Sequence, residues 1–226
     1  MTNLSKEETA ARIAKNIAAL VDHMAGEETF ILNLGVGIPT QVANYIANEN
    51  VYIQAENGML GVGPIAEGAD AHPQLINAGR QPVKETPGCS FLDSSASFGM
   101  IRGGHVDATV LGAFEVDQEA NVANWIVPGG KQLGVGGAMD LVSGANTVVI
   151  AMTHTSRGKP KLIPSCTLPI TGRHEADIVV TELGVFAYSD GVWTLKKLAP
   201  DTTLEELKGV TALAFEVPET VDTMIV

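Results

Sequence analysis

Apolar residues recur at helical spacing near the start of the chain. Ser5 is followed three residues later by Glu8, which is the sequence signature of a capping box at a helix start. The apolar positions that then fall on one face of this helix are Ile13, Ile17, Leu20, Val21 and Met24. The pattern predicts an amphipathic helix that packs one side against the core.

A strand–helix–strand unit follows. Residues 30–34 form an apolar run broken only by Asn33, which predicts a buried strand that ends in a glycine-rich turn. Pro39 suits the first turn of a helix, and residues 51–53 form the next strand. The apolar face of that helix is expected at Val42, Tyr45 and Ile46. This order is a βαβ unit, so we predict an α/β fold with a largely parallel central sheet.

The remainder of the chain continues this pattern. Residues 94–101 are typical of a helix, residues 203–207 begin another, and residues 57–90 resemble loops because Gly, Pro and Asn occur throughout. Further strands are expected at 108–111, 147–152, 178–181 and 192–195. With no repeat or low-complexity linker, we expect one domain over residues 1–226. Its predicted architecture is three layers, an open and mostly parallel sheet flanked by helices.

The low share of charged residues indicates what kind of surface this protein has. The 226 residues are 45% hydrophobic and only 18% charged, against about 25% in an average globular protein. So few charges are typical of a surface partly covered by a partner, and we expect an oligomer. The net charge is −12, and the sequence shows no basic patch of the kind that nucleic-acid-binding proteins carry. A solvated basic face, rather than a phosphate site, is the favoured interpretation of Lys131, Arg157, Lys159 and Lys161.

Several classes of protein and site are excluded. Cys89 and Cys166 form no CxxC pair, which argues against a disulfide framework or a cysteine zinc site and fits a reducing cytoplasm. The histidines show no metal-ligand spacing, so we expect no metal. The polar N-terminus does not resemble a signal peptide, and apolar runs such as residues 148–152 are too short to cross a bilayer. We expect a cytoplasmic protein that binds neither nucleic acid nor membrane.

Glu56 is the first candidate for chemistry. It lies in the segment Gln54-Ala55-Glu56-Asn57-Gly58, directly after a predicted strand. Asn-Gly is a strong hairpin signal, so the local pattern alone favours a strand closed by a turn with Glu56 merely exposed. The functional alternative is a carboxylate that acts as nucleophile or base at a strand end, where ligands of open α/β sheets bind.

Two glycine-rich turns are the other candidates. Gly35-Val36-Gly37 lacks the third glycine of a dinucleotide-binding loop and the lysine of a P-loop, so a tight strand-to-helix turn is the better interpretation. Residues 134–140 read Gly-Val-Gly-Gly-Ala-Met-Asp. This segment fits equally well an oxyanion hole of backbone amides and a flexible glycine turn before a helix.

Six segments occur in an order that resembles one family. In chain order they are Asn33 to Pro39, Glu56 to Pro64, Ile101 to Asp107, Ala123 to Trp125, Gly136 to Val142 and Thr181 to Leu183. Together they closely resemble the beta (B) subunit of class I, 3-oxoacid-type coenzyme A (CoA) transferases, which include acetate and acetoacetate transferases. The Glu-Asn-Gly and Gly-Gly-Ala-Met-Asp windows are the most specific. The resemblance runs from about the first helix to near the C-terminus.

The resemblance implies roles for individual residues. In this family the glutamate of the Glu-Asn-Gly motif, here Glu56, is the nucleophile that carries first the acyl group and then CoA. Asn33 and the backbone amides of Gly136 or Gly137 are implied to stabilise the oxyanion. The residues expected to line the substrate pocket are Asn57, Gly58, Met59, Leu60 and Phe114.

The resemblance also implies ligands and partners. CoA is a substrate, no cofactor is permanently bound, and the acyl group belongs to the acetate, acetoacetate or butyrate class. In this family an alpha (A) subunit carries a glycine-rich CoA-binding motif that this chain lacks, so we expect a hetero-oligomer such as a heterotetramer. The charge of the chain leads to the same expectation. With 14 Lys and Arg against 26 Asp and Glu, this chain has few cations for the CoA phosphates, so we expect the partner to supply much of the phosphate binding.

Three positions depart from the family pattern. Ala55 replaces the more usual serine, Val135 stands where methionine is common, and Glu115 stands where glutamine is frequent. None removes a catalytic atom, but each can reshape the pocket and its acyl preference. An acyl-CoA hydrolase of the same fold is the main alternative, in which water attacks the intermediate. A non-catalytic ligand-binding module is disfavoured, because it has no use for a carboxylate at Glu56.

Overall fold

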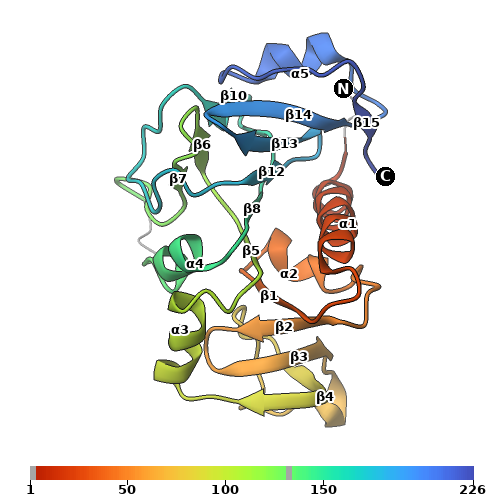
Figure 1. The fold of residues 1–226 in the computed structure, drawn as a ribbon, viewed down its shortest axis with the longest axis vertical. Coiled ribbons are helices and arrows are strands. Elements are labelled where there is room, and N and C mark those ends of the chain that lie inside the picture. The colour runs from red at the N-terminus through yellow and green to blue at the C-terminus, as the bar shows by residue number, and fades with distance from the viewer. Residues whose placement is uncertain (1–3, 131–133) are drawn as a thin grey trace.

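A single open sheet runs the length of the molecule (Figure 1). The computed structural model describes residues 4–130 and 134–226, and within these ranges ten strands follow the order β15-β14-β13-β12-β8-β5-β1-β2-β3-β4. The five central strands pair in parallel. Their bounds are β1 Phe30–Leu34, β2 Val51–Ala55, β5 Ala108–Leu111, β8 Val148–Ala151 and β12 Ile178–Val180. The predicted α/β fold with a mostly parallel sheet is confirmed.

Antiparallel strands extend the sheet on both sides. Their bounds are β3 Met59–Ile65, β4 Val83–Phe91, β13 Gly184–Ser189 and β14 Val192–Leu198, with the short β15 Asp222–Thr223 parallel to β14. Short strands make two small sheets beside the main one: β6 Glu115–Asp117, β7 Val122–Ala123, β9 Thr155–Ser156, β10 Lys159–Pro160 and β11 Leu162–Ile163.

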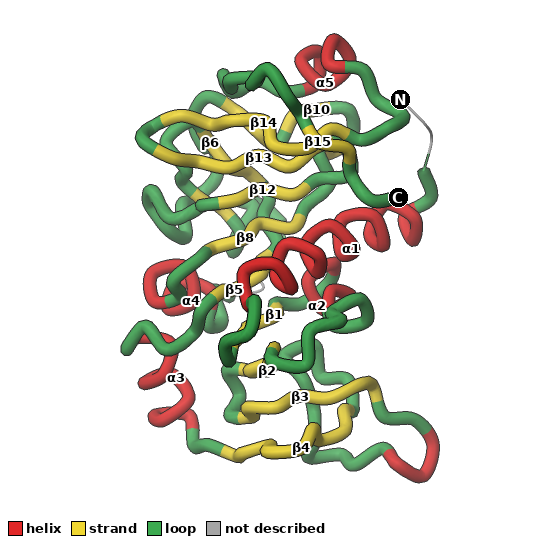
Figure 2. The backbone as a smooth tube through the Cα atoms, turned by 45° about the vertical axis from the view of Figure 1, so that its right-hand side comes forward, coloured by secondary structure: helices red, strands yellow, loops and turns green. Residues whose placement is uncertain are grey.

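Helices cover both faces of the sheet. In Figure 1, α1 (Lys6–Ala25) and α2 (Ile38–Val42) lie on one side, while α3 (Ser94–Arg102) and α4 (Ala138–Gly144) lie on the other. Figure 2 shows α1 running alongside the central strands, and the short α5 (Leu204–Val210) lies at the end of the molecule that carries β14. The capping box expected at Ser5 and Glu8 is present. The three layers predicted from the sequence are therefore confirmed.

Two aspartates accept backbone hydrogen bonds near the amino ends of the parallel strands. Asp107 precedes β5, and its carboxylate accepts from the backbone N–H of Ile31 at 2.8 Å. Asp177 precedes β12, and its carboxylate accepts from the N–H of Val148 at 2.7 Å. Each side chain satisfies a strand-end donor of a neighbouring strand, and such donors are costly to leave unpaired. Asp107, the last residue of one of the family-like segments, thus has a structural role.

The predicted extent of one helix was wrong. The helix expected to include Tyr45 and Ile46 ends at Val42, and Tyr45 is 36% exposed. The chain turns there, and the N–H groups of Ala47 and Asn48 bond to the Asp22 carboxylate of α1.

Besides its loops, the segment 57–90 contains the β3–β4 hairpin, which the sequence did not predict. Two of its glycines, Gly61 and Gly63, allow close packing between these strands. A Cβ on Gly61 would lie 2.8 Å from the Thr86 hydroxyl, and one on Gly63 would lie 2.7 Å from the Lys84 carbonyl oxygen. The absence of side chains lets the two strands approach each other closely.

A buried histidine and a half-buried lysine lie where the basic face was predicted. His154 is fully buried, and its ring nitrogens lie 3.0 Å and 2.9 Å from the hydroxyls of Thr181 and Thr211. Burial lowers the pKa of His154 to about 4. Burial also lowers the pKa of Lys161 to about 8, while the nearby Glu182 carboxylate acts in the opposite direction. For Lys161 the prediction of a solvated face was therefore wrong.

The other members of the predicted basic face differ from Lys161. Arg157 and Lys159 are exposed, as a solvated face requires, and Lys131 lies outside the described residues.

The buried His154 predicts a loss of stability in acid. The unfolded chain binds a proton at this residue below about pH 6.5, whereas the folded chain binds it only near pH 4. The free energy of unfolding should therefore fall as the pH drops from 6.5 to 4, by up to about 3 kcal/mol. Urea unfolding at pH 7 and pH 4 should show this loss in the wild type and not in His154→Gln. An equal loss in both proteins would contradict the assignment.

Candidate active site

Glu56 lies in the turn that joins β2 to β3. Ala55 pairs with Met59, and the Gly58 N–H donates to the Ala55 carbonyl oxygen at 2.9 Å, so the predicted Asn-Gly hairpin is present. Gly58 has a φ of +116°, and a Cβ there would lie 2.1 Å from the Leu92 carbonyl oxygen, so only glycine fits. The same turn holds the half-buried Glu56 at the carboxyl end of β2. The hairpin and the strand-end carboxylate are thus one feature.

Two predicted partners of Glu56 meet it in space. The amide nitrogen of Asn33 lies 3.5 Å from Glu56 Oε2. Gly137 is the N-cap residue of α4, and a Cβ built on it would lie 3.3 Å from Glu56 Cγ. With a φ of −85°, Gly137 is required for space rather than for backbone conformation. The sequence-predicted nucleophile, amide and glycine are therefore neighbours.

Gly136 differs from its neighbour. It is exposed, has a φ of +51°, and a Cβ there would meet no atom within 4 Å. Within residues 4–130 and 134–226, neither the Gly136 nor the Gly137 N–H donates a hydrogen bond. Of these two residues, Gly137 is the one that lies against Glu56.

A chain of buried side chains connects Glu56 to the central strands. The Thr109 hydroxyl lies 3.2 Å from Asn33 Oδ1, and Asn33 Nδ2 lies 2.7 Å from Gln54 Oε1. Gln54 Nε2 lies 2.9 Å from the Ser97 hydroxyl, which in turn lies 3.0 Å from the Glu56 carbonyl oxygen. The side chains of Thr109, Asn33, Gln54 and Ser97 are at most 1% exposed. We call these four the polar relay.

Contacts between α3 and α4 hold the glycine turn against Glu56. The ring of Phe98 would lie 3.4 Å from a Cβ on Gly137. Arg102 lies over that ring at 5.6 Å and bonds Asp140 through Nε at 2.6 Å. Phe98 therefore forms a wall of the site, and its position is tied to both helices.

The predicted pocket residues do not all share a face. Leu60 pairs with Gln54 on β2, whereas Met59 is turned away and packs with Ala55, Val62 and Val83. Alternation along β3 places these two neighbours on opposite faces of the hairpin.

The remaining pocket candidates lie in the adjoining turns. Asn57 is exposed and donates to the Ile76 carbonyl oxygen at 2.9 Å, and Gly58 is buried. Phe114 is half-buried, and its N–H bonds to the Ala123 carbonyl oxygen at 2.8 Å.

The three departures from the family pattern have separate surroundings. Glu115 accepts hydrogen bonds from both the N–H and the hydroxyl of Thr167 and from the N–H of Leu168. Its carboxylate is thus engaged in holding a loop. Ala55 is buried in the β2–β3 hairpin, and the carbonyl oxygen of Val135 accepts from the N–H of Ala138.

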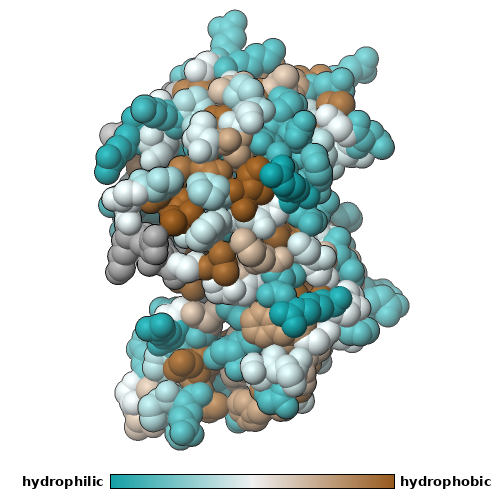
Figure 3. Space-filling view, turned by 90° about the vertical axis from the view of Figure 1, so that its left-hand side faces the viewer, coloured by the Kyte–Doolittle hydropathy of each residue, from teal (hydrophilic) through white to brown (hydrophobic). Residues whose placement is uncertain are grey.

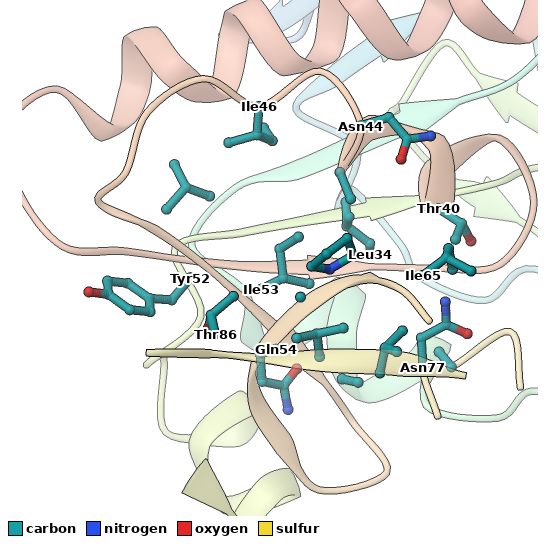
Figure 4. A pocket seen from close by; sticks show the side chains of 18 of the residues that line it. Leu34, Thr40, Asn44, Ile46, Tyr52, Ile53, Gln54, Ile65, Asn77 and Thr86 are labelled. Carbon is teal, nitrogen blue, oxygen red and sulfur yellow. The ribbon is translucent and has the colours of Figure 1, made fainter. Parts of the chain in front are cut away.

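A cavity of about 890 Å³ lies on the α2 side of β2. Figure 4 shows Leu34 and Ile53 among its apolar lining and Asn44 and Asn77 among its polar lining. The side chain of Gln54 is turned from this cavity to Ser97 on α3. No Lys or Arg is among the described residues that line it. The described lining of this cavity therefore offers no cation to a phosphate, and neither Glu56 nor Asn33 is part of that lining.

Sequence reasoning missed four residues of this site. They are Gln54, Ser97, Phe98 and Thr109. Gln54 and Thr109 could have been recognised from the sequence, because each is a polar residue within an apolar strand, as Asn33 is. A buried polar side chain must find a partner, so three such residues on neighbouring strands predict a network. Ser97 and Phe98 gave no signal beyond lying in a predicted helix.

The described part of the chain shows neither a metal centre nor a membrane span. Within these residues, no group of three or more His, Cys, Asp or Glu could hold a metal ion. No helix in the same part of the chain is long and apolar enough to span a bilayer.

Comparison with known proteins gives consistent matches. The family model for coenzyme A transferase matches residues 12–209. The beta subunit of acetate CoA-transferase from Escherichia coli K12 is 43% identical over 221 residues, 97% of each chain. One subunit of the succinyl-CoA:3-ketoacid coenzyme A transferase from Helicobacter pylori J99 is 42% identical, over 88% of this chain and 98% of the relative.

A solved structure shares the fold. An acyl-CoA transferase from Escherichia coli O157:H7 aligns with a TM-score of 0.73 at 20% identity. The alignment covers 100% of this chain and 45% of that one.

Proposed function

Because the chain belongs to the coenzyme A transferase family, we propose that it is the catalytic subunit of an enzyme that moves CoA from a short acyl-CoA to a free carboxylate. Glu56 is the nucleophile. The observation that carries the proposal is the position of its side chain, between the Asn33 amide and the Gly137 turn at the carboxyl edge of the sheet.

The reaction needs a carboxylate in the enzyme. Glu56 attacks the thioester carbonyl, the carbon–sulfur bond breaks, and an acyl-glutamyl anhydride and CoA thiolate form. The thiolate then attacks the glutamyl carbonyl and releases the free acid, leaving a glutamyl-CoA thioester. A second acid repeats these steps in reverse. Because Glu56 resembles the acids that are exchanged, the net transfer of CoA from the acyl group to Glu56 is close to thermoneutral, and the exchange requires CoA only as a substrate.

Donors beside Glu56 stabilise the tetrahedral intermediates. Each addition places a negative charge on a former carbonyl oxygen next to the glutamyl group. The Asn33 amide lies 3.5 Å from the Glu56 carboxylate, and the N–H groups of Gly136 and Gly137 have no acceptor among the described residues. One well-placed donor of this kind contributes about 2.7–4 kcal/mol to catalysis. We assign these three groups to the oxyanion.

A second subunit completes the site. The chain has 14 Lys and Arg against 26 Asp and Glu, and the large cavity beside β2 has no Lys or Arg in its described lining. The CoA phosphates therefore need cations from elsewhere. Apolar side chains gather on the face that carries α3 and α4 (Figure 3), and Phe91 and Met139, next to the site elements, are 58% and 40% exposed. We propose an alpha subunit as the partner, in a hetero-oligomer such as a heterotetramer.

The acyl group is short. The relatives are named for acetate and for succinyl-CoA and 3-ketoacids. In this chain Gly137 packs against both Glu56 and the Phe98 ring, which places an aromatic wall next to the reacting carboxylate. We propose acids of the acetate, acetoacetate and butyrate class, with Leu60 and Phe114 as further pocket residues.

Replacing the Glu56 carboxylate should abolish transfer. In the complex with the partner subunit, Glu56→Gln is expected to lower kcat by about 10⁴-fold or more, because the amide cannot form the anhydride. Glu27→Gln removes the same charge from the exposed turn before β1 and should keep wild-type kcat. Steady-state transfer from acetyl-CoA measures both variants. Wild-type turnover by Glu56→Gln would exclude Glu56 as the nucleophile.

A methyl group at Gly137 should displace Glu56. Gly137→Ala places a Cβ 3.3 Å from Glu56 Cγ, and we expect kcat to fall by about 10–100-fold, with a larger fall for Gly137→Val. The matched control is Gly209→Ala in α5, where a Cβ meets no atom within 4 Å. It should keep full activity. Equal kcat values for Gly137→Val, Gly209→Ala and the wild type would rule out a role for the turn.

The partner and the acceptor should both be required. With acetyl-CoA and acetoacetate or butyrate, the complex should transfer CoA, and the isolated chain should show less than about 1% of that activity because it lacks the phosphate-binding cations. Octanoate should be a poorer acceptor. Comparable activity from the isolated chain would refute the two-subunit proposal. Rapid release of free CoA without an acceptor acid would indicate a hydrolase.

A further inference from the structure

Gln54 is the member of the polar relay that joins a neighbouring strand to a helix. It lies on β2, two residues before Glu56, and is 1% exposed. Its Oε1 lies 2.7 Å from Asn33 Nδ2 of β1, and its Nε2 lies 2.9 Å from Ser97 Oγ of α3. It thus joins the amide beside the Glu56 carboxylate to the hydroxyl that bonds the Glu56 backbone.

The Glu56 carbonyl oxygen, at one end of the polar relay, determines which group donates in each hydrogen bond. The Glu56 carbonyl oxygen can only accept, so the Ser97 hydroxyl donates to it. Ser97 Oγ must then accept from the Gln54 amide nitrogen, which turns Gln54 Oε1 toward Asn33. Asn33 in turn presents Nδ2 to Gln54, and its Oδ1 accepts from the Thr109 hydroxyl. One backbone acceptor therefore orients both amides.

The short bond to Gln54 also limits where Asn33 can donate. Asn33 Nδ2 has two hydrogens and three acceptors: Gln54 Oε1 at 2.7 Å, the Gln54 carbonyl oxygen at 3.2 Å and Glu56 Oε2 at 3.5 Å. The first hydrogen is used by Oε1. The second is directed to the side on which the Gln54 carbonyl and the Glu56 carboxylate lie.

We propose that Gln54, acting with Ser97, is a positioning residue that fixes both sides of the reacting centre. Through Oε1 it orients the Asn33 N–H toward Glu56, and through Nε2 and Ser97 it fixes the carbonyl of the turn that carries Glu56. A primary amide accepts at one end and donates at the other, as the two partners of Gln54 require. The proposal rests on the roles proposed above for Glu56 and Asn33.

Variants of Gln54 and Ser97 test this role in the complex with the partner subunit. Gln54→Met keeps the length of the side chain and removes both hydrogen bonds, and Ser97→Ala removes the bond to Glu56. We expect each to lower kcat by about 10–100-fold while KM for acyl-CoA changes less than about 3-fold, because the reacting groups are displaced and the binding surface is not. Ser95→Ala makes the same change at an exposed position of α3 and should match the wild type.

The double variant distinguishes positioning from independent structural effects. If Gln54 and Ser97 act through one chain of bonds, Gln54→Met/Ser97→Ala should lower kcat no further than the more damaging single change. Multiplied losses, a loss confined to KM, or kcat within about 3-fold of wild type in folded variants would overturn the proposal. If Gln54→Met does not fold, Ser97→Ala against Ser95→Ala decides by the same kcat and KM criteria.

Glu56→Gln in the same assay separates this proposal from the proposed function. If Glu56→Gln is inactive and Gln54→Met has wild-type kcat, only the positioning role fails. If Glu56→Gln has wild-type kcat, the nucleophile assignment fails and the positioning role with it.

Discussion

The hydrogen bond from Ser97 to the Glu56 carbonyl oxygen is the constraint on which the site depends. It ties the β2–β3 turn to α3, and it gives the polar relay a single direction through Gln54 and Asn33 to Thr109. Polar side chains buried this deeply are tolerable only when every partner is present. A slip of β2 by one residue would turn Gln54 to the other face of the sheet and leave the relay unsatisfied, so the relay also specifies the register of the strand that carries Glu56.

The site is built on one face of the sheet and closed by packing between helices. The central parallel strands place Asn33 and Glu56 at a common edge, where ligands of open α/β sheets bind. The contact of Phe98 with Arg102, and the bond of Arg102 to Asp140, keep α4 near α3 and hold Gly137 against Glu56. The missing side chain of Gly137 is therefore a spatial requirement of the carboxylate beside it. The large cavity lies on the α2 side of β2, and neither Glu56 nor Asn33 lines it.

The sequence predicted α1 and the central strands. The apolar residues of α1 recur at helical spacing and are buried, and β5 and β8 are continuous apolar runs that are buried along their whole length. The sequence did not predict the β3–β4 hairpin, where a Cβ on Gly61 or Gly63 would lie too close to the neighbouring strand. At Glu56 the predicted hairpin is present and holds the acid at the strand end, and the role of Glu56 as nucleophile stays a proposal. Asn33 and Gly137 were found through family resemblance, whereas Ser97 and Phe98 could not be found. Their roles depend on how α3 packs, which local patterns do not contain.

Mapping the covalent intermediate tests the central claim most directly. The complex is incubated with acetyl-CoA without an acceptor acid, quenched in acid, digested and analysed by mass spectrometry. The account predicts a CoA adduct on the peptide that contains Glu56, located by fragmentation at that residue. An adduct on another residue, or an active complex that forms none, would contradict it.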